Sequence, residues 1–188
     1  MRDILDQRRF VFLPIRLSLA SVTERSDEVR RKTFERAVKL LAAKSRSVAE
    51  LRERLLQKKG TNKAVVEVVI SRLREYGYLD DERFALSYAS SKVKQRPIGR
   101  RRLQRDLKLK QVDNKVAEET LELVYAETPE EQLIDRAIEK RIRLRGRPKS
   151  RAEAKSLFDH LLRQGFGFEL VSEKVRAAVQ YTDDPDEC

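Results

Sequence analysis

One short segment constrains the fold more than any other part of the chain, because it ends one helix and begins another. It spans positions 77–88 and has the sequence Gly-Tyr-Leu-Asp-Asp-Glu-Arg-Phe-Ala-Leu-Ser-Tyr. Gly77 can adopt the left-handed backbone conformation that terminates a helix, and Asp80 can accept hydrogen bonds from the first free amides of the next helix. Phe84, Ala85 and Tyr88 then follow at helical spacing. The segment therefore predicts a junction between two helical units, each with a buried face.

The apolar pattern around this junction recurs three times. When the second and third helices of each unit are superimposed, three apolar positions align without a gap. The aligned residues are Leu51, Leu103 and Leu157; Leu55, Leu107 and Leu161; and Val69, Leu121 and Val175. Charged residues make up 39% of the chain, with few glycines and prolines and no tryptophan, so helix formers dominate. We predict an all-α protein whose three tandem three-helix repeats form an elongated, curved array.

Capping signals and composition place the predicted boundaries. Ser47 with Glu50, and Ser150 with Glu153, form capping boxes, and Thr128 is expected to cap the first helix of the third repeat. Leu56 is expected to face inward with its neighbours. The predicted divisions are a flexible leader at 1–33, repeats at 34–79, 80–127 and 128–181 that begin with a helix near 34–43, and a disordered acidic tail at 182–188.

The N-terminal leader contains an apolar stretch at 10–20 that resembles a secretion signal. Pro14 and Arg16 interrupt this stretch, and it is too short to span a bilayer. A flexible leader is therefore favoured over a signal peptide. We expect a cytoplasmic protein that does not enter a membrane.

Positive charge is concentrated in two blocks. The whole chain has a formal net charge of +11 and a pI near 9.9, which implies an acidic partner such as nucleic acid or an anionic protein surface. Basic residues dominate 83–112 and 136–151, whereas acidic residues dominate 113–135 between them. Uneven charge of this kind favours a binding surface over an ordinary solvated helix face.

The middle repeat carries the clearest basic ridge. Leu103 and Leu107 fix the buried stripe of its second helix, so Arg101, Arg105 and Lys108 lie on another face at spacings of four and three. Like charges at this spacing repel each other unless an anion lies against them. The predicted partner-binding or nucleic-acid-binding residues are Lys92, Lys94, Arg96, Arg100, Arg101, Arg102, Arg105, Lys108, Arg143, Arg145, Arg147 and Lys149.

Three motifs resemble those of the bacterial RecX family. The first is Ser-Val-Ala-Glu-Leu at 47–51, which leads into Lys-Lys-Gly at 58–60. The second is the segment at 77–88, and the third is Gly99 followed by Arg102-Leu103 and Asp106-Leu107. The Gly-Tyr-Leu-Asp-Asp run with its following arginine and aromatic residue is the most specific of the three. Together with the repeat pattern, the resemblance covers residues 35–180.

The resemblance implies a function that composition alone does not reveal. RecX-family proteins are similar in fold, with three repeats of three helices, and they bind the filament of the RecA recombinase along its groove. There they inhibit ATP hydrolysis and DNA strand exchange without being enzymes. The resemblance therefore implies a monomeric regulator of homologous recombination, DNA repair and the SOS response. Its partners would be the RecA filament and, secondarily and without sequence preference, DNA.

The remaining residues do not assemble into a predicted catalytic or metal site, and no cofactor is expected. His160 is the only histidine and Cys188 the only cysteine, so neither has the companions that a catalytic or metal centre needs. The alternative function is a direct DNA-binding regulator, because the second and third helices of each repeat resemble a helix-turn-helix. Its third helices offer poor base readers, namely Val65, Val66, Val69, Glu118, Glu119 and Glu122.

Overall fold

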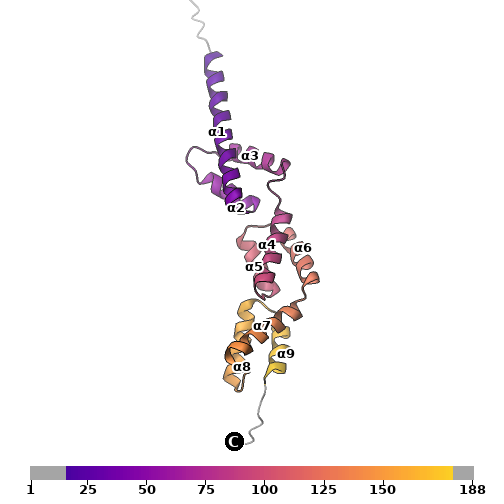
Figure 1. Ribbon diagram of the computed structural model, residues 1–188. Coiled ribbons are helices and arrows are strands. Elements are labelled where there is room, and N and C mark those ends of the chain that lie inside the picture. Colours follow the sequence, from indigo (N-terminus) through magenta and orange to yellow (C-terminus); the bar gives the residue numbers. More distant parts are fainter. Residues whose placement is uncertain (1–15, 180–188) are drawn as a thin grey trace, which may run out of the picture.

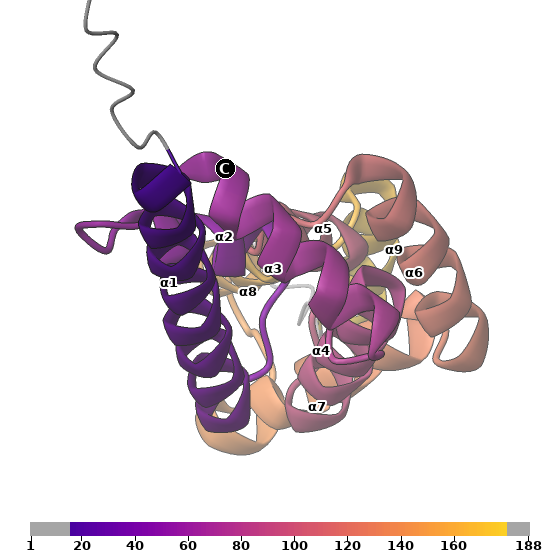
Figure 2. The same cartoon turned by 90° about the horizontal axis from the view of Figure 1, so that it is seen from above.

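The computed structural model describes residues 16–179, and all regular structure within that range is helical. The helices are α1 (Arg16–Ala43), α2 (Val48–Leu56), α3 (Lys63–Glu75), α4 (Asp81–Gln95), α5 (Arg100–Leu109), α6 (Asn114–Glu127), α7 (Glu130–Arg145), α8 (Arg151–Gln164) and α9 (Phe168–Ala178). They pack in threes, and the three units follow one another along an elongated molecule (Figure 1). Seen from above, α1 and α6 lie on opposite sides, so the units do not stack in a straight line (Figure 2). The predicted all-α, elongated fold is confirmed.

The junction at 77–88 has the predicted geometry. Gly77 has a φ of +69°, and the amide of the following Tyr78 donates to Leu73 O over 2.9 Å, which closes the C-terminus of α3. The Asp80 carboxylate accepts a hydrogen bond from the Arg83 amide over 2.9 Å and begins α4. These bonds confirm the predicted roles of Gly77 and Asp80.

Two local predictions in the helical units are wrong. Thr128 ends α6 by donating its amide to Val124 O (2.9 Å), and α7 begins after Pro129 without a side-chain cap. Pro129 itself occupies the cap position of α7, with a φ of −54° and a ψ of 143°, so Thr128 lies one residue too early to cap this helix. Leu56 is 40% exposed because it is the last residue of α2, beyond the buried stripe of Leu51 and Leu55.

The predicted flexible leader is wrong for residues 16–33, which belong to the 28-residue helix α1. Ion pairs one turn apart support this segment, for example Lys32 with Glu28 at 2.7 Å and Arg31 with Glu35 at 2.9 Å. Thr33 is buried, and its hydroxyl donates to Val29 O over 2.7 Å. The rest of the predicted leader, at 1–15, and the predicted acidic tail at 182–188 lie outside the described residues.

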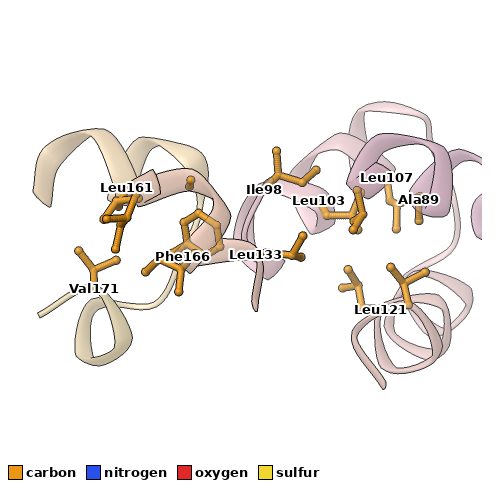
Figure 3. Packing of buried hydrophobic residues seen from close by; sticks show 14 of the residues in the cluster. Ala89, Ile98, Leu103, Leu107, Leu121, Leu133, Leu161, Phe166 and Val171 are labelled. Atoms are coloured by element: carbon orange, nitrogen blue, oxygen red, sulfur yellow. The ribbon is translucent and has the colours of Figure 1, made fainter. Parts of the chain in front are cut away.

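Buried side chains form two separate hydrophobic cores. One core belongs to α1–α3 alone, whereas the other runs without interruption through α4–α9 (Figure 3). All nine residues of the aligned repeat positions are buried, which confirms the register of the repeat. The second and third units therefore share one core, while the first unit has its own.

The junction between the second and third units is tight and largely apolar. Ile98, Leu133 and Phe166 pack together across it (Figure 3). Backbone also meets backbone, because the Gly99 amide donates to Gln164 O over 3.0 Å. A Cβ atom on Gly99 would lie 2.3 Å from the carbonyl carbon of Gly165, so only glycine fits there.

The junction between the first and second units is polar instead. The Ser47 hydroxyl donates to Lys110 O over 2.6 Å, and the Val48 amide donates to Asp81 Oδ1 over 2.8 Å. Glu50 lies half-buried nearby, with Lys110 Nζ at 3.6 Å from its Oε2. Hydrogen bonds and ion pairs, not a shared core, therefore position the first unit against the second.

Ser47→Ala is expected to lower the free energy of unfolding by about 2 kcal/mol. The change removes the cap of α2, worth about 1 kcal/mol, and leaves a buried Lys110 carbonyl without its partner, which costs about 1 kcal/mol more. Urea denaturation would measure the loss. Ser150→Ala is the matched control, because Ser150 caps α8 in the same way but is exposed. Equal losses in the two variants would contradict a stabilising role for the Ser47–Lys110 bond.

Candidate partner-binding surface

The basic ridge of α5 is exposed as predicted. Leu103 and Leu107 are completely buried, whereas Arg101, Arg105 and Lys108 lie on the exposed side of the helix. Within residues 16–179 these three side chains form no ion pair. We refer to Arg101, Arg105 and Lys108 as the α5 ridge. Its charges are accessible to a partner.

Two other arginines of the predicted set, Arg100 and Arg102, form contacts within the fold and are not free like the α5 ridge. The Arg100 guanidinium pairs with Glu122 of α6, and its backbone amide donates to Glu130 Oε1 of α7 over 2.9 Å. Arg102 Nη1 donates to Gln164 Oε1 of α8 over 2.8 Å. The contact with Glu122 lies within the second unit, whereas those with Glu130 and Gln164 tie the start of α5 to the third unit.

Two of the predicted lysines, Lys92 and Lys94, lie in the last turn of α4 in the second unit. Lys92 Nζ lies 5.3 Å from the centroid of the Tyr88 ring, a cation–π contact, and Tyr88 stacks on the buried Phe84. Lys94 is exposed beside Ser90 and Ser91 on a shallow face. Lys92 is thus partly engaged, while Lys94 is open to solvent.

The basic residues of the third unit surround two hollows between α7 and α8. The first, of about 370 Å³, is lined by Arg141, Arg145 and Arg147. The second, of about 270 Å³, is lined by Arg96 from the loop before α5 together with Lys140, Arg141 and His160. Arg143 and Lys149 are exposed, and they are neighbours in sequence of residues that line the larger hollow. The structure therefore brings Arg96 of the middle unit together with the basic residues of the third.

Sequence analysis missed four residues of this region, namely Lys140, Arg141, His160 and Arg163. Arg141 follows the buried Ala137 and Ile138 by four and three residues, so it continues the inward stripe of α7. That spacing could have identified it. His160 lies on α8, and the two helices come together only in the folded chain.

Positive neighbours perturb the ionisation of this region. Burial lowers the pKa of His160 below its ordinary value of 6.5, and the charges of Arg141, Arg163 and Arg145 lower it further. Burial and the charges of Arg145 and Arg163 also lower the pKa of Arg141. Positive charge therefore predominates in this cluster, and the lowered pKa of His160 leaves its ring neutral at pH 7.

We expect His160 to reduce stability in mild acid. Because its pKa is lower in the folded than in the unfolded chain, the unfolded chain binds the proton first as the pH falls below about 6.5. Stability contributed by the neutral ring is therefore present above that pH and is lost as the pH falls toward the folded-state pKa. His160→Gln should flatten the decline in urea-unfolding free energy between pH 7.5 and 5.5. An unchanged decline in the variant would contradict this assignment.

Comparison with known proteins identifies the family. Two sequence models match the chain, described as the first three-helix domain of RecX at residues 34–73 and the second at residues 80–121. Regulatory protein RecX of Chlorobium limicola is 33% identical over 145 residues, which cover 77% of this chain and 87% of that protein. The chain belongs to the RecX family. The resemblance stated from the sequence motifs is thereby confirmed.

Other RecX proteins agree in sequence or in fold. Regulatory protein RecX of Bacillus licheniformis is 32% identical over 84% of this chain, although the match spans only 57% of that longer protein. The crystal structure of RecX from Lactobacillus salivarius matches with a TM-score of 0.71, covering 81% of this chain and 97% of that one at 18% identity. The RecX relatives are named regulatory proteins, and a regulatory role is therefore supported for this chain.

The described part of the RecX-family chain contains no other candidate centre of known chemistry. Among residues 16–179, no three histidine, cysteine, aspartate or glutamate side chains are grouped so that they could hold a metal ion. None of the helices in that range is both long and apolar enough to cross a membrane.

Proposed function

We propose that this protein binds the RecA recombinase filament and lowers its ATP hydrolysis and strand exchange. The observation that carries the proposal is the α5 ridge, whose three cations are exposed and without ion-pair partners in the described chain. Membership of the RecX family is the reason that we propose RecA as the partner. An acidic protein surface or a nucleic acid held within the filament would complement this charge.

The elongated shape supports a partner with a repeating surface. Three units follow one another in the molecule, and the second and third are fixed rigidly by a shared core. Arrays of this kind present extended surfaces that contact several sites along a partner. The protein would act as a cytoplasmic monomer that contacts more than one filament subunit, and it would need no catalytic group.

DNA is proposed as a secondary contact that does not depend on sequence. The third helix of the middle unit, α6, presents Glu118, Glu119 and Glu122 as exposed residues. Carboxylates there would repel phosphate, and the helix offers no row of arginine, asparagine or glutamine to contact base edges. A direct DNA-binding regulator of the helix-turn-helix type is therefore the weaker candidate.

Single-stranded-DNA-dependent ATP hydrolysis by the cognate RecA tests the proposal. The protein is titrated into the reaction at several salt concentrations, and its binding to the same DNA without RecA is measured in parallel. We expect inhibition at concentrations too low to occupy bare DNA. Inhibition only when the DNA itself is coated, with the salt dependence of phosphate binding, would identify a DNA competitor and overturn the proposal.

A further inference from the structure

Arg141 occupies a special position, because it lines both hollows between α7 and α8. On one side it shares the larger hollow with Arg145 and Arg147, and on the other it shares the smaller one with Arg96 and Lys140. Arg141 Nη2 lies 3.4 Å from the Ser156 hydroxyl of α8, a long contact that leaves most of its donors available. The guanidinium is thus presented to two cavities large enough to hold a small anion.

Negative charge that could balance this cluster is scarce. Among residues 16–179, Glu153 is the single acidic residue that lines either hollow, and its Oε2 already accepts the Lys149 amide over 2.7 Å. Cations face Arg141 from its own helix, from α8 and from both neighbouring loops. Burial, and after it the positive charges of Arg145 and Arg163, lower the pKa of Arg141. An anion bound between these cations would offset their mutual repulsion.

We propose that the hollows between α7 and α8 form a phosphate-binding site centred on Arg141. The planar guanidinium suits a tetrahedral oxyanion, because it can donate two parallel hydrogen bonds. Arg145 lies one helical turn further along α7, so both can contact the same anion. Ile142, Pro148 and Leu157 add apolar surface to the wall of the larger hollow, and hydrogen bonds beside apolar surface are stronger than bonds in open water.

The proposed site would recognise the phosphate group itself, whatever molecule carries it. It can come from the backbone of single-stranded DNA or from a free phosphate compound such as pyrophosphate. The site deepens the secondary DNA contact of the proposed function, but it stands on the geometry of the third unit and of the loop that carries Arg96. Its test omits RecA, so a failure here would leave the proposed action on the filament intact.

His160 provides a unique probe, because it is the only histidine in the chain. Its ring lines the smaller hollow beside Arg141, and the cations that face it are Arg141 and Arg145 from α7, Arg163 from α8, and Arg96 and Lys140 across the hollow. A bound phosphate would offset these charges and raise the pKa of His160. The experiment is a pH titration of the His160 ring signals by NMR on untagged protein, alone, with pyrophosphate, and with a short oligothymidylate.

We expect both probes to raise the pKa of His160, with oligothymidylate acting at lower concentration if DNA is the natural source. Saturation by pyrophosphate with no response to oligothymidylate would assign the site to free phosphates. Arg141→Gln should weaken pyrophosphate binding about tenfold or more, whereas Arg176→Gln on α9, an exposed arginine of the same unit, should not. Arg145 is exposed, and Arg145→Gln should likewise weaken pyrophosphate binding. An unchanged pKa with both probes, or equal weakening by Arg176→Gln, would overturn the proposal.

Discussion

Replacement of Arg101, Arg105 and Lys108 by alanine is expected to raise the concentration needed for half-inhibition of RecA about 10- to 100-fold. Each exposed charge pair contributes up to about 1 kcal/mol, and three lost together correspond to this range. The side chains are exposed and form no ion pairs in residues 16–179, so folding does not depend on them. The melting temperature should stay nearly constant, since removing like charges from one helix costs nothing. Inhibition of ATP hydrolysis and thermal unfolding measure the two effects.

A matched variant separates position from net charge. Replacement of Arg54, Lys58 and Lys59 by alanine also removes three positive charges, but from exposed sites in the first unit. This control should inhibit nearly as well as the unmodified protein, at any given salt concentration. If it loses as much inhibition as the α5 ridge variant, general electrostatic attraction would explain the binding and the ridge would have no special role. Loss of helical content in the ridge variant would instead make these residues structural.

Phe166→Ala is expected to lower the free energy of unfolding by about 3–5 kcal/mol. The ring is 1% exposed and belongs to the core that α4–α9 share, at the junction of the second and third units. Removal of the ring leaves a cavity. The elements around it cannot move closer to fill it, because the backbones of Gly99 and Gly165 are already in contact. Urea denaturation followed by circular dichroism would measure the loss.

The neighbouring Phe168 provides a control of identical chemistry. It is 59% exposed and makes one edge-to-face contact with Phe158, with ring centroids 5.4 Å apart. Phe168→Ala should therefore cost about 1 kcal/mol. Similar losses for the two variants would show that Phe166 does not hold the junction together.

The sequence predicted the helical units well because their signals are local. Apolar spacing and capping residues act within one or two turns, so Gly77, Asp80 and Ser47 could be assigned their roles from neighbouring residues alone. The start of α1 was missed for the opposite reason. Residues 16–33 contain few apolar residues, so the periodic apolar pattern that marks the other helices is weak there, whereas ion pairs one turn apart are present in the fold.

The candidate site was predictable only in part. Exposure of the α5 ridge followed from the helical register of Leu103 and Leu107. The structural roles of Arg100 and Arg102 did not, because their partners Glu122 and Gln164 are remote in sequence. The cluster around Arg141 was missed for the same reason, since it exists only where α7 meets α8. Long-range pairing, and not residue type, decides which arginines form contacts within the fold and which are left accessible to a partner.

The division into two cores has a consequence for the order in which the chain folds during synthesis. The core of the first unit is complete once Leu79 has left the ribosome, so this unit can fold while the rest is still being made. The other core needs Val175, and at ordinary elongation rates roughly 5–20 s separate the two events. During that interval the nascent chain would carry a folded first unit, while the core that supports α5 and its ridge is still incomplete. A ribosome stalled before α9 should therefore display a protease-resistant first unit followed by a protease-sensitive remainder.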